Sequence, residues 1–213
     1  MPIRDRRTTP MPPLRARAAQ WLAWLCRRRA CQPACLLALL LACTTFEALA
    51  RSEPSQPAVS LEYAVKATYL YKLAPFVNWP PDEFTAPDAP FRICVAGDDP
   101  FDDYLTKAVA RRRLGAHPFE VRKLDTLTAD AQCQIVFISH LPSQSIRQAL
   151  DAVNGMPMLT VVDSTAPEQG GIVQFVIEQG RVRFVIDTVA AARNRLTISS
   201  KLLNLAVAVR DAQ

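Results

Sequence analysis

Residues 91–101, FRICVAGDDPF, constrain the fold more than any other stretch of the chain. The first six of these residues are apolar except for Arg92, which is typical of a strand buried on both faces of an α/β sheet. Gly97 permits a tight turn, Asp99 can cap a helix N-terminus, and Pro100 suits the first helical position. This order of strand, glycine, aspartate, proline and helix predicts the opening of a βαβ unit.

The chain downstream repeats this alternation. It predicts one three-layer α/β domain over residues 61–210, with a mostly parallel sheet and an antiparallel edge hairpin. Before the first strand, apolar residues at three- and four-residue steps predict an amphipathic helix that Ser60 caps and Pro75 kinks. The residues expected on its core-facing side are Leu61, Val65, Tyr69, Leu73, Phe76 and Val77. Helices are expected at 61–79, 101–112, 142–153, 190–195 and from 199 or 200 to 209, and strands at 91–96, 119–124, 134–139, 158–162, 172–177 and 182–186.

Residues 1–50 predict a secretory signal peptide. They combine a basic region, the apolar run at 34–43 and an Ala-x-Ala site that ends at Ala50. The apolar run is shorter than the roughly 20 residues that span a membrane. We therefore expect Sec-dependent export to the periplasm, cleavage near Ala50, and a disordered, proline-containing spacer at 51–60. The alternatives are an uncleaved anchor, a start codon placed too far upstream, and a lipoprotein in which Cys43 carries the lipid.

The positive charge of the chain belongs to this leader. Eight arginines against two acids give the leader a surplus of six, so the formal charge of +5 becomes −1 for residues 51–213. A near-neutral domain has no global field that attracts nucleic acid, and we expect no such partner. The run Arg111, Arg112 and Arg113 is expected to form a solvated face at a helix C-terminus, with a docking patch as the alternative.

Two cysteines, Cys94 and Cys133, remain after the leader is removed. An even pair in an exported protein predicts a disulfide, and two buried free thiols are the alternative. The first and third strands of a doubly wound sheet are neighbours, which favours the bridge. Their Cα atoms must still approach within about 7 Å.

The chain offers little material for catalysis, and we expect it not to be an enzyme. Of its two histidines, His117 is expected in a solvent-exposed turn. Parallel sheets bind ligands at the carboxyl ends of their strands, and polar residues are expected to gather there. This candidate ligand edge comprises Asp98, Asp99, Ser139, His140, Asp163 and Ser164.

A hydrolase that uses His140 is the third hypothesis for the function, after a regulator and a ligand-binding sensor. It ranks last because neither Ser139 nor Ser164 lies in a G-x-S-x-G elbow.

Metal and cofactor sites are not expected, because no histidine or cysteine pair has metal-ligand spacing and no glycine-rich phosphate loop is present. Tyr71 and Trp79 are expected outside the core-facing stripe of the first helix. They form a candidate partner surface, with a wide core face as the alternative.

Six segments of the chain carry a resemblance to a known family. They are VKATYLYKLAPFVNWP at 65–80, FRICVAGDDPF at 91–101, CQIVFIS at 133–139, GMPMLTVVDS at 155–164, GIVQFVIEQGRVRFVID at 171–187 and LTISSKLLNLA at 196–206. In their order and spacing the chain resembles the YfiR-like family of small exported bacterial proteins. Gln174 and Asp187 stand where family members tend to have Asn, which puts any shared polar contact there in doubt. A second cysteine pair, seen in some members, is absent after Cys133.

The resemblance implies a periplasmic regulator. Such a protein binds the periplasmic domain of an inner-membrane diguanylate cyclase and represses it, which lowers cyclic di-GMP and with it biofilm formation. Cys94 and Cys133 match the family's cysteine positions, so the resemblance also implies a redox-sensitive disulfide. A homodimer is a further expectation. The alternative function is a periplasmic sensor module that binds a small ligand.

Overall fold

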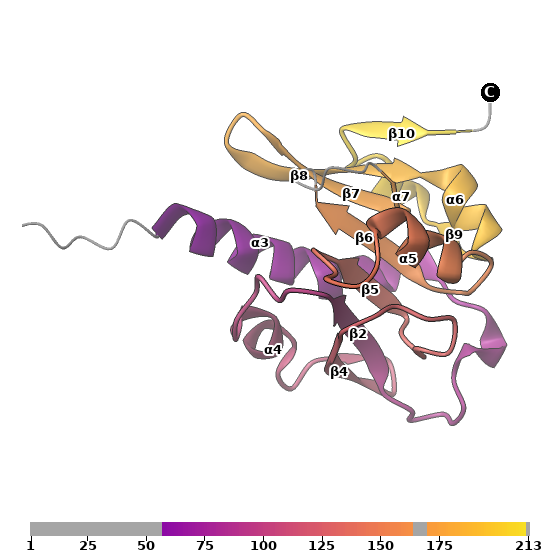
Figure 1. Ribbon diagram of the computed structural model, residues 1–213. Coiled ribbons are helices and arrows are strands. Elements are labelled where there is room, and N and C mark those ends of the chain that lie inside the picture. The colour runs from indigo at the N-terminus through magenta and orange to yellow at the C-terminus, as the bar shows by residue number, and fades with distance from the viewer. Residues whose placement is uncertain (1–56, 164–169, 212–213) are drawn as a thin grey trace, which may run out of the picture. The chain divides into compact units, whose positions relative to one another are not determined.

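The structure, a computed structural model, describes residues 57–163 and 170–211 (Figure 1). All residue-level statements below concern these residues, and the side chains of residues 57–60 are left aside. Outside the described residues lie the predicted leader at 1–50 with Ala50 and Cys43, the larger part of the predicted spacer at 51–60, and Ser164.

An eight-stranded sheet runs through the described part of the chain in the order β10-β8-β7-β6-β5-β2-β4-β3 (Figure 1). The strands β4, β2, β5, β6 and β7 run parallel to one another, and β8 pairs antiparallel with β7. The predicted mostly parallel sheet with an antiparallel hairpin is therefore confirmed. The strands are β2 (Phe91–Ala96), β3 (Arg113–Leu114), β4 (His117–Leu124), β5 (Ile135–Ile138), β6 (Leu159–Asp163), β7 (Val173–Glu178), β8 (Arg181–Asp187) and β10 (Ala208–Arg210).

Helices pack on both faces of this sheet, as the three-layer prediction requires. Phe91, Ile93 and Val95 of β2 contribute to a larger core with α3 and α4, whereas Cys94 and Ala96 contribute to a smaller core with α5. This alternation follows from the two-residue period of a strand. The remaining elements are α3 (Pro57–Leu73), η2 (Ala74–Phe76), η3 (Pro81–Glu83), α4 (Tyr104–Val109), α5 (Ile146–Ala152), α6 (Thr188–Arg193), α7 (Ser200–Leu203) and the antiparallel pair β1 (Val77–Asn78) and β9 (Thr197–Ile198).

The helix α3 differs from the prediction in its start, its end and its buried face. It begins at Pro57, inside the predicted spacer, so Ser60 does not cap its start. A 3-10 turn follows at Ala74–Phe76, where Pro75 cannot continue the helical hydrogen bonds. The predicted buried face is wrong at Leu61, which is 66% exposed, and at Val65, which is 37% exposed. Of the other predicted residues, Leu73 and Val77 are buried, and Tyr69 and Phe76 pack against the core. The buried positions that the prediction missed are Lys66, Ala67, Leu70 and Ala74.

The segment after β2 forms a turn before its helix begins. The backbone N–H of Phe101 donates to Asp99 Oδ1 over 2.9 Å, so Asp99 stabilises this turn and not a helix N-terminus. Asp102 has a φ of 49°, which is not helical, and α4 therefore starts only at Tyr104. The predicted helix at 101–112 is correct in place and too long.

The turn glycine Gly97 brings the ends of three strands together. Its φ is 88°, and a Cβ there would lie 2.2 Å from the carbonyl oxygen of His140. The N–H of Gly97 donates to Leu124 at the end of β4, and the N–H of Asp98 donates to His140 beyond β5. Only glycine fits this close approach.

The helix α5 starts at Ile146, later than the predicted residue 142. Ser145 accepts from the N–H of Gln148, and the Gln148 side chain accepts from the N–H of Ser145. This capping box fixes the start of the helix, and its S-x-x-Q signature is present in the sequence.

The predicted C-terminal helix extending to residue 209 is wrong. The helix α7 ends at Leu203, and the chain then forms β10, which pairs in parallel with β8. A short edge strand contains only two or three apolar residues. Their spacing is too short a pattern to distinguish a helix from a strand. The doubtful family position Gln174 accepts from Arg210 of β10 over 3.0 Å, and Asp187 caps α6 through the N–H of Ala190.

Candidate functional site

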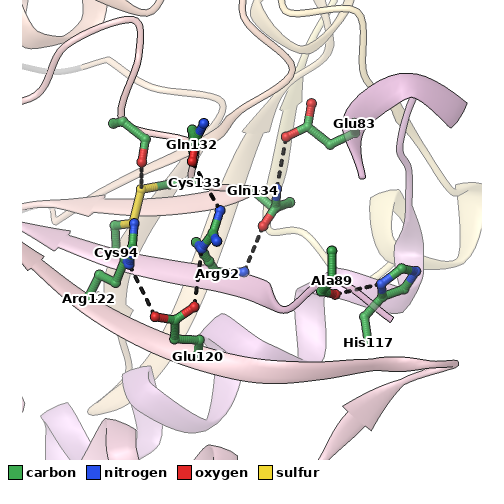
Figure 2. Close-up of polar contacts among 11 residues, drawn as sticks. Glu83, Ala89, Arg92, Cys94, His117, Glu120, Arg122, Gln132, Cys133 and Gln134 are labelled. Atoms are coloured by element: carbon green, nitrogen blue, oxygen red, sulfur yellow. Dashed lines mark hydrogen bonds and ion pairs between the residues drawn. A yellow bond between two sulfur atoms is a disulfide. The ribbon is translucent and has the colours of Figure 1, made fainter. Parts of the chain in front are cut away.

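A disulfide joins Cys94 of β2 to Cys133, which lies two residues before β5 (Figure 2). The two Cα atoms are 6.0 Å apart and both side chains are buried in the smaller core. The strands β2 and β5 are neighbours in the sheet, as predicted for the first and third strands. The predicted bridge is therefore present, and it closes a loop that spans 39 residues of sequence.

A set of charged side chains lies on the sheet beside the disulfide (Figure 2). Glu120 of β4 accepts from Arg92 over 3.1 Å and from Arg122 over 3.2 Å. Arg92 also donates to the side chain of Gln132, next to Cys133, over 3.4 Å. Because these groups are partly exposed, each ion pair stabilises the fold by only about 0–1 kcal/mol.

Gln134 connects the amino ends of two strands to the segment η3 (Figure 2). It is buried, its Oε1 accepts from the N–H of Arg92 over 2.6 Å, and its Nε2 donates to Glu83 over 2.9 Å. Burial raises the pKa of Glu83, and the hydrogen bond from Gln134 opposes that rise in part. The amide thereby couples the loop that carries η3 to the strand that carries Cys94.

A cleft of about 260 Å³ opens beside these groups, at the amino ends of the parallel strands. Charges of both signs and two methionines line it, and Cys133 forms part of its wall. The sequence predicts a ligand site at the opposite edge of the sheet, at the carboxyl ends of the strands. It does not predict this cleft. Its lining includes Asp82, Glu83, Arg92, Gln134, Met156 and Arg195.

His117 does not lie in an exposed turn, so that prediction is wrong. It begins β4, is half-buried, and its Nδ1 forms a hydrogen bond of 2.7 Å with the carbonyl of Ala89 (Figure 2). Its ring stacks on Phe84 with centroids 3.9 Å apart. The histidine therefore holds the 81–90 loop against the edge of the sheet.

The candidate ligand edge is only partly assembled. Asp98 and His140 are exposed and adjoin through a backbone hydrogen bond of 2.9 Å, and the N–H of Ser139 donates to Ala96. Asp99 forms an ion pair with Lys123 over 2.7 Å, and this hydrogen bond raises the pKa of the lysine. Within the described residues, no side-chain hydrogen bond links His140 to these aspartates or to Ser139.

Asp163, the last residue of β6, takes part in a buried charged cluster that sequence reasoning missed. It forms an ion pair with Lys66 of α3, whose side chain is wholly buried and also pairs with Glu62. Tyr63 donates to Asp163 over 3.3 Å, and its ring centroid lies 4.6 Å from Lys66 Nζ. The spacing of Glu62 and Lys66 by four residues was the available signal, but the buried partner lies 97 residues further along the chain.

The two aromatic residues of the candidate partner surface are both half-buried. Trp79 meets Phe91 edge-on at 5.2 Å and donates to the carbonyl of Ala74 over 3.2 Å. Tyr71 meets Phe119 at 6.1 Å, and Phe119 meets Phe91 at 5.2 Å. The two residues therefore belong to one aromatic cluster at the β2–β4 end of the sheet, with part of each ring accessible.

No described helix has the length and apolarity needed to cross a membrane. The described histidine, cysteine, aspartate and glutamate residues form no group of three or more that could hold a metal ion.

The α/β sheet, the buried disulfide and the order of elements define a small α/β domain crosslinked between two neighbouring strands of its sheet. The family model described as YfiR/HmsC-like (DUF4154) matches residues 63–207, and the chain belongs to this family. No curated protein matches the chain.

Proposed function

We propose that the protein is a periplasmic regulator that binds the periplasmic part of an inner-membrane diguanylate cyclase and holds it inactive. Family membership over residues 63–207 is the observation that carries this proposal, because regulation of such cyclases is what the family implies. The basic leader with an Ala-x-Ala site before Arg51 supports export, and we propose cleavage near Ala50. A disulfide between Cys94 and Cys133 fits the oxidising periplasm.

Inhibition follows from differential affinity. A regulator that binds the inactive conformation of the cyclase more tightly than the active one shifts the population toward the inactive state. A shift from 1:99 to 99:1 needs a preference of about 10⁴-fold for the favoured state. The output then depends on whatever changes the affinity of the regulator, and cyclic di-GMP rises when that affinity falls.

The disulfide is the proposed point of redox control. A periplasmic dithiol attacks the bridge and transfers two electrons and two protons to it. Cys94 and Cys133 become thiols, and the dithiol becomes a disulfide. Reduction releases Cys133 and its loop from β2, beside the strand ends that Gln134 connects to η3. The rearranged surface binds the cyclase more weakly.

The test is the cyclic di-GMP content of cells that lack the gene. We expect the content to rise on deletion and to return to normal with the full chain, but not with a chain that lacks residues 2–50 and stays in the cytoplasm. An unchanged content on deletion would contradict the proposal. Rescue by the leaderless chain would contradict the periplasmic location.

A second candidate, a small-ligand sensor, is favoured by the cleft of about 260 Å³ beside the disulfide. A ligand present at 100 times its Kd stabilises the folded state by about 2.7 kcal/mol, which thermal-shift screening detects. A compound that raises the melting temperature of the protein but not of an Arg92→Ala variant would support this function. If no compound in a broad metabolite set does so, the candidate is not supported.

A further inference from the structure

A groove of about 280 Å³ lies where the end of α3 meets the outer edge of the sheet. The sequence alone does not connect Tyr71 with the run of arginines at 111–113. In the structure, Tyr71, Arg112 and Arg113 line the same groove. Aromatic rings form its apolar part, and cations surround them. The residues used below are Tyr71, Phe76 and Phe119, which we call the aromatic floor, and Lys72, Arg112 and Arg113, which we call the cationic rim.

The charge of the cationic rim is not neutralised by the described residues. No acidic side chain lines the groove. Within the described residues, Lys72, Arg112 and Arg113 form no ion pair, while the nearby Glu120 is shared between Arg92 and Arg122. The groove therefore presents three positive charges beside accessible aromatic surface.

Protein contacts hold the two arginines of the cationic rim. Arg112 Nε donates to the carbonyl of Ala108 over 2.7 Å, and the guanidinium lies 4.6 Å from the ring centroid of Tyr71. Arg113 donates to the carbonyl of Ala116. A guanidinium has five N–H donors, so each arginine keeps donors for a carboxylate. Because these contacts restrict the two arginine side chains before binding, binding costs less conformational entropy.

We propose that this groove is the docking site for an acidic segment of the cyclase's periplasmic part, one that carries apolar or aromatic side chains between its carboxylates. The proposal rests on the proposed function. The carboxylates bind the cationic rim, and an apolar side chain packs on the aromatic floor. Charge complementarity selects this occupant: a basic segment is repelled, and a second copy of the chain would oppose two cationic rims.

The direct test uses a synthetic peptide in which aspartates alternate with phenylalanines, labelled for fluorescence anisotropy. The variant is Lys72→Glu with Arg113→Glu, two exposed positions of the rim. The control is Arg111→Glu, since Arg111 is exposed and adjacent but does not line the groove. Melting curves of all three proteins verify that they fold.

We expect the peptide to bind the wild-type protein and the control equally, and the double variant at least about tenfold more weakly. Binding should also weaken at about 1 M salt, where the Debye length is ~3 Å. A peptide in which lysine replaces aspartate should not bind. The proposal is overturned if the acidic peptide does not bind, if the double variant binds it as well as the control does, or if the basic peptide binds equally.

Cyclic di-GMP measurements in cells separate this inference from the proposed function. If the double variant fails to rescue a deletion strain while Arg111→Glu rescues it, the groove is the docking site. If deletion raises cyclic di-GMP and both variants rescue it, the proposed function stands and the groove proposal fails. If deletion has no effect, the proposed function fails, and with it the identity of the partner.

Discussion

Different interactions stabilise the packing on the two faces of the sheet. On one face, α3 and α4 cover a larger core whose apolar residues come from strands across the sheet, and a buried ion pair joins Lys66 to Asp163. On the other face, the smaller core under α5 contains the disulfide between Cys94 and Cys133. The larger core thus lies beside a buried charge pair, whereas the smaller one contains a covalent link.

This difference determines where chemical control can act. A buried ion pair loses stability when either partner is removed, and no redox change affects it. A disulfide can be opened reversibly by a dithiol. The smaller core is therefore the face on which the proposed redox control would act.

The largest expected effect is from Asp163→Ala, which breaks the larger core's ion pair. It leaves the wholly buried Lys66 without its β6 partner, and such a loss typically costs about 3–5 kcal/mol. Urea denaturation followed by circular dichroism measures the free energy of unfolding. Glu120→Ala is the control, because Glu120 pairs with two cations but is partly exposed, and its loss should cost less than about 1 kcal/mol.

A second substitution sharpens this result. Adding Lys66→Met to Asp163→Ala removes the buried lysine charge that has lost its β6 partner, and should recover part of the lost stability. If both single and double variants unfold at the wild-type urea concentration, the buried pair does not hold α3 to the sheet.

The next effect is removal of the bridge by Cys94→Ala with Cys133→Ala. The chain-entropy model gives about 4 kcal/mol for a loop of this length, and measured losses are typically ~2–4 kcal/mol. The wild-type protein with and without dithiothreitol should show the same difference in urea. A loss below about 1 kcal/mol would mean that the smaller core does not depend on its covalent link.

Ser145→Ala tests the smaller face without touching the disulfide. It removes one half of the capping box of α5 and should cost about 1 kcal/mol of unfolding free energy. The loss of unfolding free energy should be larger in the variant that also carries Cys94→Ala and Cys133→Ala, if the cap and the bridge support the same cooperative unit. Strict additivity in that double-mutant cycle would show that they act independently.

The smallest effect concerns the pH dependence contributed by Glu83. Its pKa is raised in the folded protein, so the folded state holds this proton more tightly than the unfolded state. That contribution is fully present below the usual value of 4.5 and is lost as pH rises through the folded pKa. Glu83→Gln should therefore stabilise the protein slightly at neutral pH relative to wild type and lose this advantage in acid. Melting curves across pH measure it, and an advantage that grows in acid would contradict the sign.

Sequence patterns predicted the sheet well because buried parallel strands are nearly continuous apolar runs. The prediction extended to the neighbouring positions of β2 and β5, and so to the pairing of Cys94 with Cys133. The first turns of the predicted buried face of α3 were misplaced, at Leu61 and Val65, for a specific reason. A lysine counts as polar in any periodicity, and its partner Asp163 lies 97 residues away, so only the tertiary structure shows that Lys66 can be buried.

Sites were harder to predict than strands. The carboxyl edge was a reasonable candidate by fold, but its members form separate contacts there, such as Asp99 with Lys123 and Asp163 with Lys66. Two clefts among the described residues lie elsewhere, at the amino edge and beside Tyr71, because loop conformation decides where side chains leave space. Nothing in the local sequence encodes how those loops return to the sheet.

Hydrogen–deuterium exchange on oxidised and dithiothreitol-reduced protein tests most directly whether the two faces are held independently. Because only the face under α5 contains the disulfide, we expect reduction to speed amide exchange in the 125–133 loop, in α5 and in the adjoining ends of β2 and β5. Exchange in α3 and α4 should not change. Faster exchange that is uniform over the domain, or that is confined to α3 and α4, would contradict it.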